Sequence, residues 1–162
     1  MSDQLPNLHF RLATENDASF IDALAPRLIP EVMPSYRQRN EVIAGLRALQ
    51  QQHLRDSPPG SYLYICENNP GRRIGLLHLQ RVRDVMTDRY NAHILQIALP
   101  EKYEAQGFGR AMMVFAETWA NQHQCDLLTL NVFPGNIRAR RLYEACGFET
   151  DQFRLAKQTD PR

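Results

Sequence analysis

Hydrophobic residues recur at helical spacing in four stretches of the chain, with polar residues on the opposite faces. The spacing predicts a first helix after Thr14, interrupted by Pro26, and a second helix over residues 38–55. A third helix is predicted over residues 108–122 and a short fourth one after Asn136.

The segments between these helices are rich in β-branched and aromatic residues, which favour strands. The predicted strands cover residues 9–13, 61–67, 74–82, 92–99 and 127–133, with a last strand or hairpin over residues 148–156. Asn68-Asn69-Pro70-Gly71 is a strong turn signal, so the second and third strands should form a hairpin. Three consecutive strands in the middle of the chain indicate an α/β fold of the α+β kind. Such a fold has a mixed, mostly antiparallel sheet with helices on its faces.

Length and composition fit one globular domain over residues 1–162. A formal net charge of +1 argues against nucleic acid or a membrane surface as a partner. Cys66, Cys125 and Cys146 lie far apart and form neither a C-x-x-C pair nor a metal-ligand cluster, so we expect free thiols and no metal. The first residues do not read as a signal peptide, and no apolar run approaches the roughly 18 residues of a membrane span. We therefore expect a cytoplasmic location.

A turn with two glycines one residue apart, Gly107 and Gly109, runs directly into the third predicted helix. Glycines let the backbone approach a ligand, and the first turn of a helix offers unpaired N–H groups and a positive dipole end to an anion. The junction therefore predicts a phosphate-binding site. It does not match the dinucleotide fingerprint, because Met112 occupies the third glycine position. A nucleotide phosphotransferase is also disfavoured, because G-x-x-x-x-G-K-[S/T] is absent.

Two stretches resemble the signature motifs of the GCN5-related N-acetyltransferase (GNAT) superfamily. Residues 103–113, Tyr-Glu-Ala-Gln-Gly-Phe-Gly-Arg-Ala-Met-Met, are similar to the family's acyl-CoA pyrophosphate loop, R/Q-x-x-G-x-G/A followed by an apolar helix. Residues 130–148, Leu-Asn-Val-Phe-Pro-Gly-Asn-Ile-Arg-Ala-Arg-Arg-Leu-Tyr-Glu-Ala-Cys-Gly-Phe, are similar to its strand followed by N-x-x-A-x-x-L-Y-x-x-x-G-F. The resemblance covers nearly the whole chain. It implies a sheet of six to seven strands, splayed at its central strands and flanked by about four helices.

The resemblance implies acetyl-CoA as the cofactor, bound by the glycine loop and by the strand before it. The implied cofactor-binding residues are Ile97, Ala98, Leu99, Glu104, Ala105, Gln106, Gly107, Phe108, Gly109, Arg110, Asn136 and Tyr143. Glu104 departs from the family, which has Gln or Arg at this position. A carboxylate beside a pyrophosphate costs on the order of 1 kcal/mol when it is well solvated. We therefore expect Glu104 to point outward, while backbone N–H groups of the loop supply most of the binding.

The resemblance also places Tyr143 near the thioester sulfur, where a phenol can protonate the departing thiolate as a general acid. Helical periodicity alone favours a core tyrosine at this position. Asn136 likewise has two roles open to it, the N-cap of the fourth helix and a contact to the cofactor.

For the general base, His93 is the nearest match to the residue that the family places in this strand. Simple alternation puts it on the same face as Ile97 and Leu99, unless a bulge intervenes. His78 in the preceding strand is the second choice. A surface or structural histidine, or a chain of waters in place of a base, is an alternative reading.

The acceptor pocket implied by the resemblance lies at the connection between the first two helices. Met33 and Tyr36 are candidate lining residues, and Glu31 is a candidate partner for an ammonium group. The resemblance implies transfer of an acetyl group to a primary amine of a small molecule or protein, and the identity of the acceptor stays open. The alternative is a non-catalytic acyl-CoA-binding sensor or regulatory module. Such enzymes often pair as homodimers through the last segment, here residues 148–157.

Overall fold

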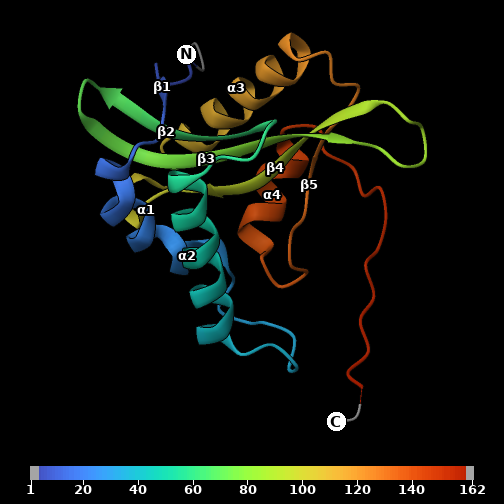
Figure 1. Ribbon diagram of the computed structural model, residues 1–162. Helices are drawn as coiled ribbons and strands as arrows, with labels where there is room; N and C mark the ends of the chain where they lie inside the picture. The colour runs from blue at the N-terminus through green and yellow to red at the C-terminus, as the bar shows by residue number, and fades with distance from the viewer. Residues whose placement is uncertain (1–3, 160–162) are drawn as a thin grey trace.

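The computed structural model describes residues 4–159, drawn in Figure 1. The strands are β1 (His9–Leu12), β2 (Ser61–Asn69), β3 (Arg72–Arg83), β4 (Tyr90–Ala98) and β5 (Leu128–Leu130). The α-helices are α1 (Ala18–Leu24), α2 (Arg39–Arg55), α3 (Phe108–Gln122) and α4 (Ile137–Ala145). Short 3-10 helices are η1 (Glu15–Asp17), η2 (Ala25–Leu28) and η3 (Glu101–Tyr103).

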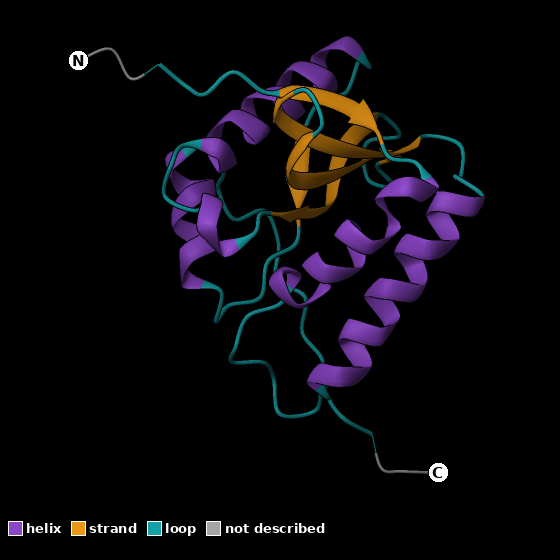
Figure 2. Ribbon diagram, turned by 90° about the vertical axis from the view of Figure 1, so that its left-hand side faces the viewer, coloured by secondary structure: helices purple, strands orange, loops and turns teal. Residues whose placement is uncertain are grey.

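The five strands form one sheet in the order β1-β2-β3-β4-β5. All neighbours pair antiparallel except β4 and β5, which pair parallel. Figure 2 shows helices on both faces of the sheet. One hydrophobic core joins α3 to residues such as Leu77, Leu79 and Ile94, and the other joins α1 to Leu63 and Ile65. The predicted fold class is confirmed.

A bulge in β4 changes which face its side chains take. Gln96 pairs with His78, but the next β3 residue, Leu79, pairs with Ile94, so Leu95 is an extra residue in the ladder. Ile94 and Ile97 consequently pack on the same α3 face although they lie an odd number of residues apart. The bulge thus reverses the alternation along the strand.

The pairing of β4 with β5 is short. It runs only from Ala92 to Ile94 on β4 and from Leu128 to Leu130 on β5. From Leu95 to Ala98, β4 keeps its bonds to β3 and has no strand on its other side within the described residues. The expected splay at the central strands is therefore confirmed.

Two expected elements differ in the structure. The first helix divides into η1, α1 and η2, and Pro26, which has no N–H group to donate to an α-helical bond, lies in the first turn of η2 directly after α1 ends. The predicted last strand over residues 148–156 is wrong, since these residues are extended coil, and the described residues hold five strands rather than six to seven. A strand needs a neighbour to satisfy its backbone, and the adjacent edge strand β5 is only three residues long.

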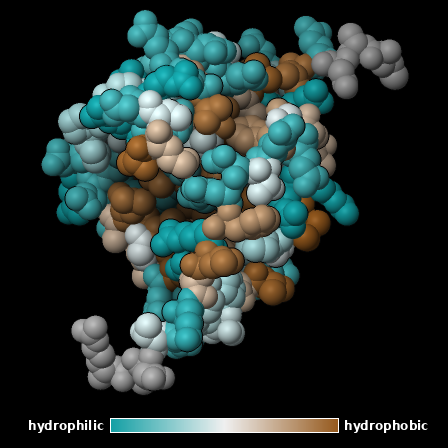
Figure 3. Space-filling model, turned by 90° about the vertical axis from the view of Figure 1, so that its right-hand side faces the viewer, coloured by the Kyte–Doolittle hydropathy of each residue, from teal (hydrophilic) through white to brown (hydrophobic). Residues whose placement is uncertain are grey.

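The C-terminal segment is exposed to solvent. Phe153 is 85% exposed and Leu155 is 90% exposed. Figure 3 views the side that carries this segment and the β3–β4 hairpin, and it shows hydrophobic side chains exposed among polar ones. Within residues 4–159, no helix has the length and apolar character needed to cross a bilayer.

Candidate functional site

The glycine loop leads from η3 into the N-terminus of α3. Ala105 and Gly107 both have left-handed backbone, with φ of 55° and 81°, and Gly107 is the N-cap of the helix. The first internal bond is donated by the N–H of Ala111 to the carbonyl of Gly107 at 3.0 Å. The N–H groups of residues 108–110 precede it, so the helix itself gives them no acceptor. They are available to an anion.

Gly109 lets α4 approach this helix start closely. A Cβ atom on Gly109 would lie 3.1 Å from Leu142 of α4 and 3.9 Å from Leu99. The loop, the end of β4 and α4 therefore meet at one point, and a larger residue at position 109 would push them apart.

Glu104 does not point outward into solvent as expected. Its side chain is only 18% exposed, and its two carboxylate oxygens pair with Arg27 of η2 and Arg138 of α4. Two guanidinium groups around one carboxylate leave a net positive charge beside the glycine loop. The carboxylate that seemed unfavourable for a phosphate is thus neutralised by residues that the local motif does not contain.

The pairing of β4 with β5 ends at Ile94 and Leu130, and we call the region between the two segments beyond this point the slot. One wall is the free edge of β4 from Leu95 to Ala98, which includes the predicted residues Ile97 and Ala98. The other side carries Asn136 and Tyr143. Asn136 is the N-cap of α4, and its side chain accepts a hydrogen bond from the N–H of Ala139 at 3.3 Å. The capping role is therefore confirmed, and the cofactor contact stays a prediction.

Tyr143 is half-buried beside the α3 core, with its ring 5.9 Å from that of Phe148. Burial raises the pKa of Tyr143 above its ordinary value of 10.0. The phenol therefore keeps its proton at neutral pH, as a proton donor must.

His93 lies one residue before the β4–β5 pairing ends, directly opposite Thr129 of β5. Because of the bulge, His93 does not share a face with Ile97 and Leu99. It points to the opposite face, the one on which Gln96 bonds Gln50 of α2 at 3.1 Å. The expected face was wrong, because alternation assumed a regular strand.

Thr129 fixes the state of the His93 ring. Nδ1 of His93 lies 2.9 Å from the Thr129 hydroxyl, and that hydroxyl donates to the carbonyl of Ala92 at 3.3 Å. A hydroxyl has a single proton, so it accepts from His93, which places the ring proton on Nδ1. Nε2 is then left with a free lone pair. Burial lowers the pKa of His93 below its ordinary value of 6.5, so the ring is neutral at pH 7.

His78, the second choice for a base, is buried on the α2 side of the sheet. It is 1% exposed, and its Nε2 lies 2.8 Å from the hydroxyl of Ser61. Burial, with a smaller contribution from His53, lowers the pKa of His78 to about 3. An acceptor has no access to this ring in the structure, which favours His93.

The loop between η2 and α2, which was predicted to shape the acceptor pocket, packs against the loop between β5 and α4. A Cβ atom on Gly135 would lie 2.9 Å from the carbonyl oxygen of Val32. Of the three predicted residues, Tyr36 lines a cavity along α2, whereas Glu31 and Met33 line neither this cavity nor the one beside the glycine loop.

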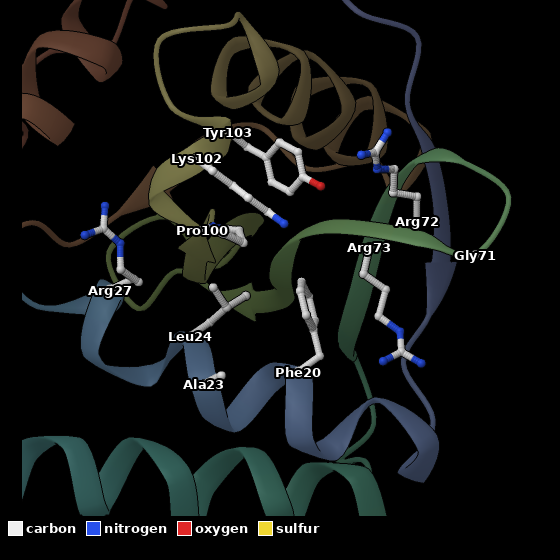
Figure 4. A pocket seen from close by; sticks show the side chains of 10 residues that line it. All are labelled: Phe20, Ala23, Leu24, Arg27, Gly71, Arg72, Arg73, Pro100, Lys102 and Tyr103. Atoms are coloured by element: carbon white, nitrogen blue, oxygen red, sulfur yellow. The ribbon is translucent and has the colours of Figure 1, made fainter.

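A cavity of about 720 Å³ is a cationic groove beside the glycine loop. Figure 4 shows Lys102 and Tyr103 extending across it, with Phe20 and Leu24 of α1 below them. Its charged lining residues are Arg27, Arg72, Arg73 and Lys102. Neither Asn136 nor Tyr143 lines it, whereas Arg27 belongs both to its lining and to the ion pairs around Glu104.

Sequence reasoning missed three residues of this site, Arg27, Arg138 and Thr129. Arg27 lies 77 positions before Glu104, and no local pattern links the two. Thr129 is equally invisible, because its contact to His93 depends on the register between β4 and β5. Arg138 alone had a signal, since it lies inside the second motif.

Comparison with known proteins gives a family match over most of the chain. A model described as the acetyltransferase (GNAT) family matches residues 26–148, which include both sequence motifs.

Solved structures of similar fold span nearly the same length. A tetramutant of a Bacillus halodurans protein is 16% identical and has a TM-score of 0.73, with 93% of this chain and 99% of that chain covered. The aminoglycoside N-acetyltransferase AAC(6')-Iy in complex with CoA is 13% identical, with a TM-score of 0.68 and coverage of 98% and 99%. A transcriptional regulator from Bacillus halodurans C-125 is 18% identical, with a TM-score of 0.68 and coverage of 94% and 100%. At such identities, these structures show a shared fold.

Replacing Glu104 tests its effect on the phosphate site. We expect Glu104→Gln to tighten coenzyme A binding by roughly fivefold, about 1 kcal/mol, because two guanidinium groups become free to meet phosphate. Isothermal titration calorimetry measures this, and the gain should shrink as salt screens the charges. Glu101→Gln, at an exposed neighbouring carboxylate, is the control and should change little. Equal or weaker binding by Glu104→Gln contradicts the prediction.

Proposed function

Because the chain belongs to the acetyltransferase (GNAT) family, we propose that it transfers the acetyl group of acetyl-CoA to a primary amine by direct attack. The acceptor is an amine of a small molecule or protein. The observation that carries the proposal is the separation of β4 from β5 after Ile94, between His93 on β4 and the start of α3, whose first N–H groups have no acceptor within the helix.

The residues present fit the family's cofactor, acetyl-CoA. Free N–H groups at residues 108–110 and the net positive cluster around Glu104 suit a pyrophosphate. The free edge of β4 from Leu95 to Ala98 suits the amide groups of a pantetheine arm. When bound, the cofactor supplies a thioester carbonyl to the acceptor amine.

Tyr143 is the proposed general acid. The new C–N bond forms as the C–S bond breaks, and the phenol of Tyr143 delivers a proton to the departing sulfur. Its raised pKa supports this role, because the group is protonated before the reaction. Its place on α4, beside the slot, supports it further.

His93 is the proposed general base. Its Nε2 lone pair accepts the proton that the amine loses, while Thr129 holds Nδ1–H. Because burial lowers its pKa, the base form persists at neutral pH and is lost only as the pH falls through that lowered pKa. Thr129 is thus a positioning residue that acts through His93.

A regulatory module that binds acyl-CoA without turnover is the second candidate. Glu104 in place of the family's Gln or Arg favours it, and a protein described as a transcriptional regulator shares the fold. His93 and Tyr143 flanking the slot favour turnover.

A thiol-release assay separates these two functions. Acetyl-CoA is mixed with the protein and a panel of primary amines, and free thiol is measured over time. We expect release that depends on the acceptor. Tight coenzyme A binding without any acceptor-dependent release would overturn the enzyme and favour the regulatory module.

Removing the phenol of Tyr143 tests the general acid. We expect Tyr143→Phe to lower kcat by about 10²–10⁴-fold, the usual contribution of a positioned acid, because the departing thiolate must then find its proton in water. Coenzyme A affinity, measured by calorimetry, should stay within about twofold, since the ring and its packing remain. If kcat is unchanged in Tyr143→Phe, Tyr143 is not the general acid and serves only in packing.

Removing the hydroxyl of Thr129 tests the positioning of His93. We expect Thr129→Val to leave the His93 proton free to occupy either ring nitrogen, and to lower kcat by part of the ~10²–10⁴-fold that a general base supplies. Thr129→Ser should keep both the tautomer and the rate. Nitrogen NMR of His93 reports the tautomer, and the pH dependence of kcat/KM reports its pKa. The role is contradicted if Thr129→Val keeps the proton on Nδ1.

A further inference from the structure

The second cavity of the molecule, of about 470 Å³, lies along one face of α2, and we call it the α2 groove. It is lined at one end by Tyr36 and Arg37, and along the helix by Glu41, Gly45, Leu46 and Leu49. We propose that the α2 groove binds the non-reacting part of the acceptor, and that this part is an apolar chain or ring ending in a second cationic group. The inference rests on the proposed function and names its substrate class.

The first observation concerns Gly45, a glycine that destabilises α2 although no packing contact requires it. A glycine in the middle of a helix destabilises it by roughly 0.5–1 kcal/mol relative to alanine. A Cβ atom at Gly45 would meet nothing within 4 Å, so no neighbouring atom requires the glycine. What the missing side chain provides is open space in the wall of the α2 groove.

The lining offers apolar contact area that the protein leaves open to solvent. Tyr36 is 42% exposed and Leu49 is 39% exposed, while Gln50 and His53, on the adjoining stripe of α2, are buried. Pockets for small molecules are mostly apolar with a few placed polar groups, and volumes of about 300–1,000 Å³ are typical of them. The volume of the α2 groove lies within this range, and its lining combines apolar residues with Arg37, Gln38 and Glu41.

Charge decides the kind of ligand. Glu41 forms no ion pair with any of the described residues. The one cation of the lining, Arg37, lies over the rings of Tyr36 and Phe133, with its guanidinium 5.9 Å and 5.8 Å from their centres. A carboxylate without a partner, at the edge of an apolar surface, favours an ammonium group.

Two contacts connect the α2 groove to the slot. Phe133, which receives Arg37, lies in the loop between β5 and α4 that borders the slot. On the other side, Gln50 of α2 bonds Gln96 of β4, three residues after His93. Figure 1 shows α2 running from the loop that follows η2 up to the sheet. A long molecule lying on α2 can therefore direct one end toward His93 while its other end meets Glu41.

Matched acceptors test the proposal. Acceptor KM and kcat are measured for straight-chain primary alkylamines and for α,ω-diamines of equal chain length. We expect the wild type to prefer the diamine, and Glu41→Gln to lower this preference roughly fivefold, the worth of a solvated ion pair, while monoamines are unaffected. Equal use of both amine classes by the wild type would overturn the charge assignment.

Filling the space at Gly45 tests the apolar part. We expect Gly45→Leu to raise acceptor KM about tenfold without changing coenzyme A affinity. Gly45→Ala should raise KM less and also raise Tm, because alanine favours the helix. Ala44→Leu, at an exposed position of α2 that faces away from the groove, is the matched control and should leave KM unchanged. A Gly45 variant that behaves like the control overturns the inference.

Failure of the groove and failure of the enzyme are distinguishable. If no amine produces thiol release, the proposed function fails, and calorimetric titration of a diamine into the coenzyme A-loaded protein then tests the α2 groove alone. Binding that is lost in Glu41→Gln and Gly45→Leu supports the groove. Binding that neither substitution alters overturns it.

Discussion

The parallel ladder between β4 and β5 ends at Ile94 and Leu130, and the other features of the site depend on where it ends. Before that pair, the strands are held together, and this is where His93 meets Thr129. After it, the outer edge of β4 is free, while β3 still holds the strand in place. In a continuous sheet the next strand would occupy these backbone groups. The early end of the ladder is what makes a slot.

A second constraint is electrostatic and connects three parts of the chain. Glu104 lies between Arg27 and Arg138, so the loop, η2 and α4 are joined by charge at the mouth of the slot. Each exposed ion pair alone contributes little to stability. Their effect here is on the local potential, because the carboxylate holds two cations beside the helix start without cancelling both. The predicted phosphate site therefore stays positive although the motif contains an acid.

Local patterns predicted the elements well and the pairing of residues poorly. The helix over residues 108–122 and the turn at Gly107 follow from spacing and from glycine, and both were confirmed. The strand over residues 148–156 failed, because alternation describes a strand's faces and cannot supply the neighbour that must bond to it. The face of His93 failed for a related reason, since one extra residue in β4 reverses every later side chain.

The sequence by itself determined what each segment can do. Its periodicity set the helices, its glycines set the anion-binding turn, and the placement of Asn136 set the cap of α4. Only the tertiary structure decided which groups act together, namely Glu104 with Arg27 and His93 with Thr129. The physical reason is distance along the chain. Propensity and capping depend on neighbours a few residues away, whereas ion pairs and tautomers depend on register and packing between remote segments.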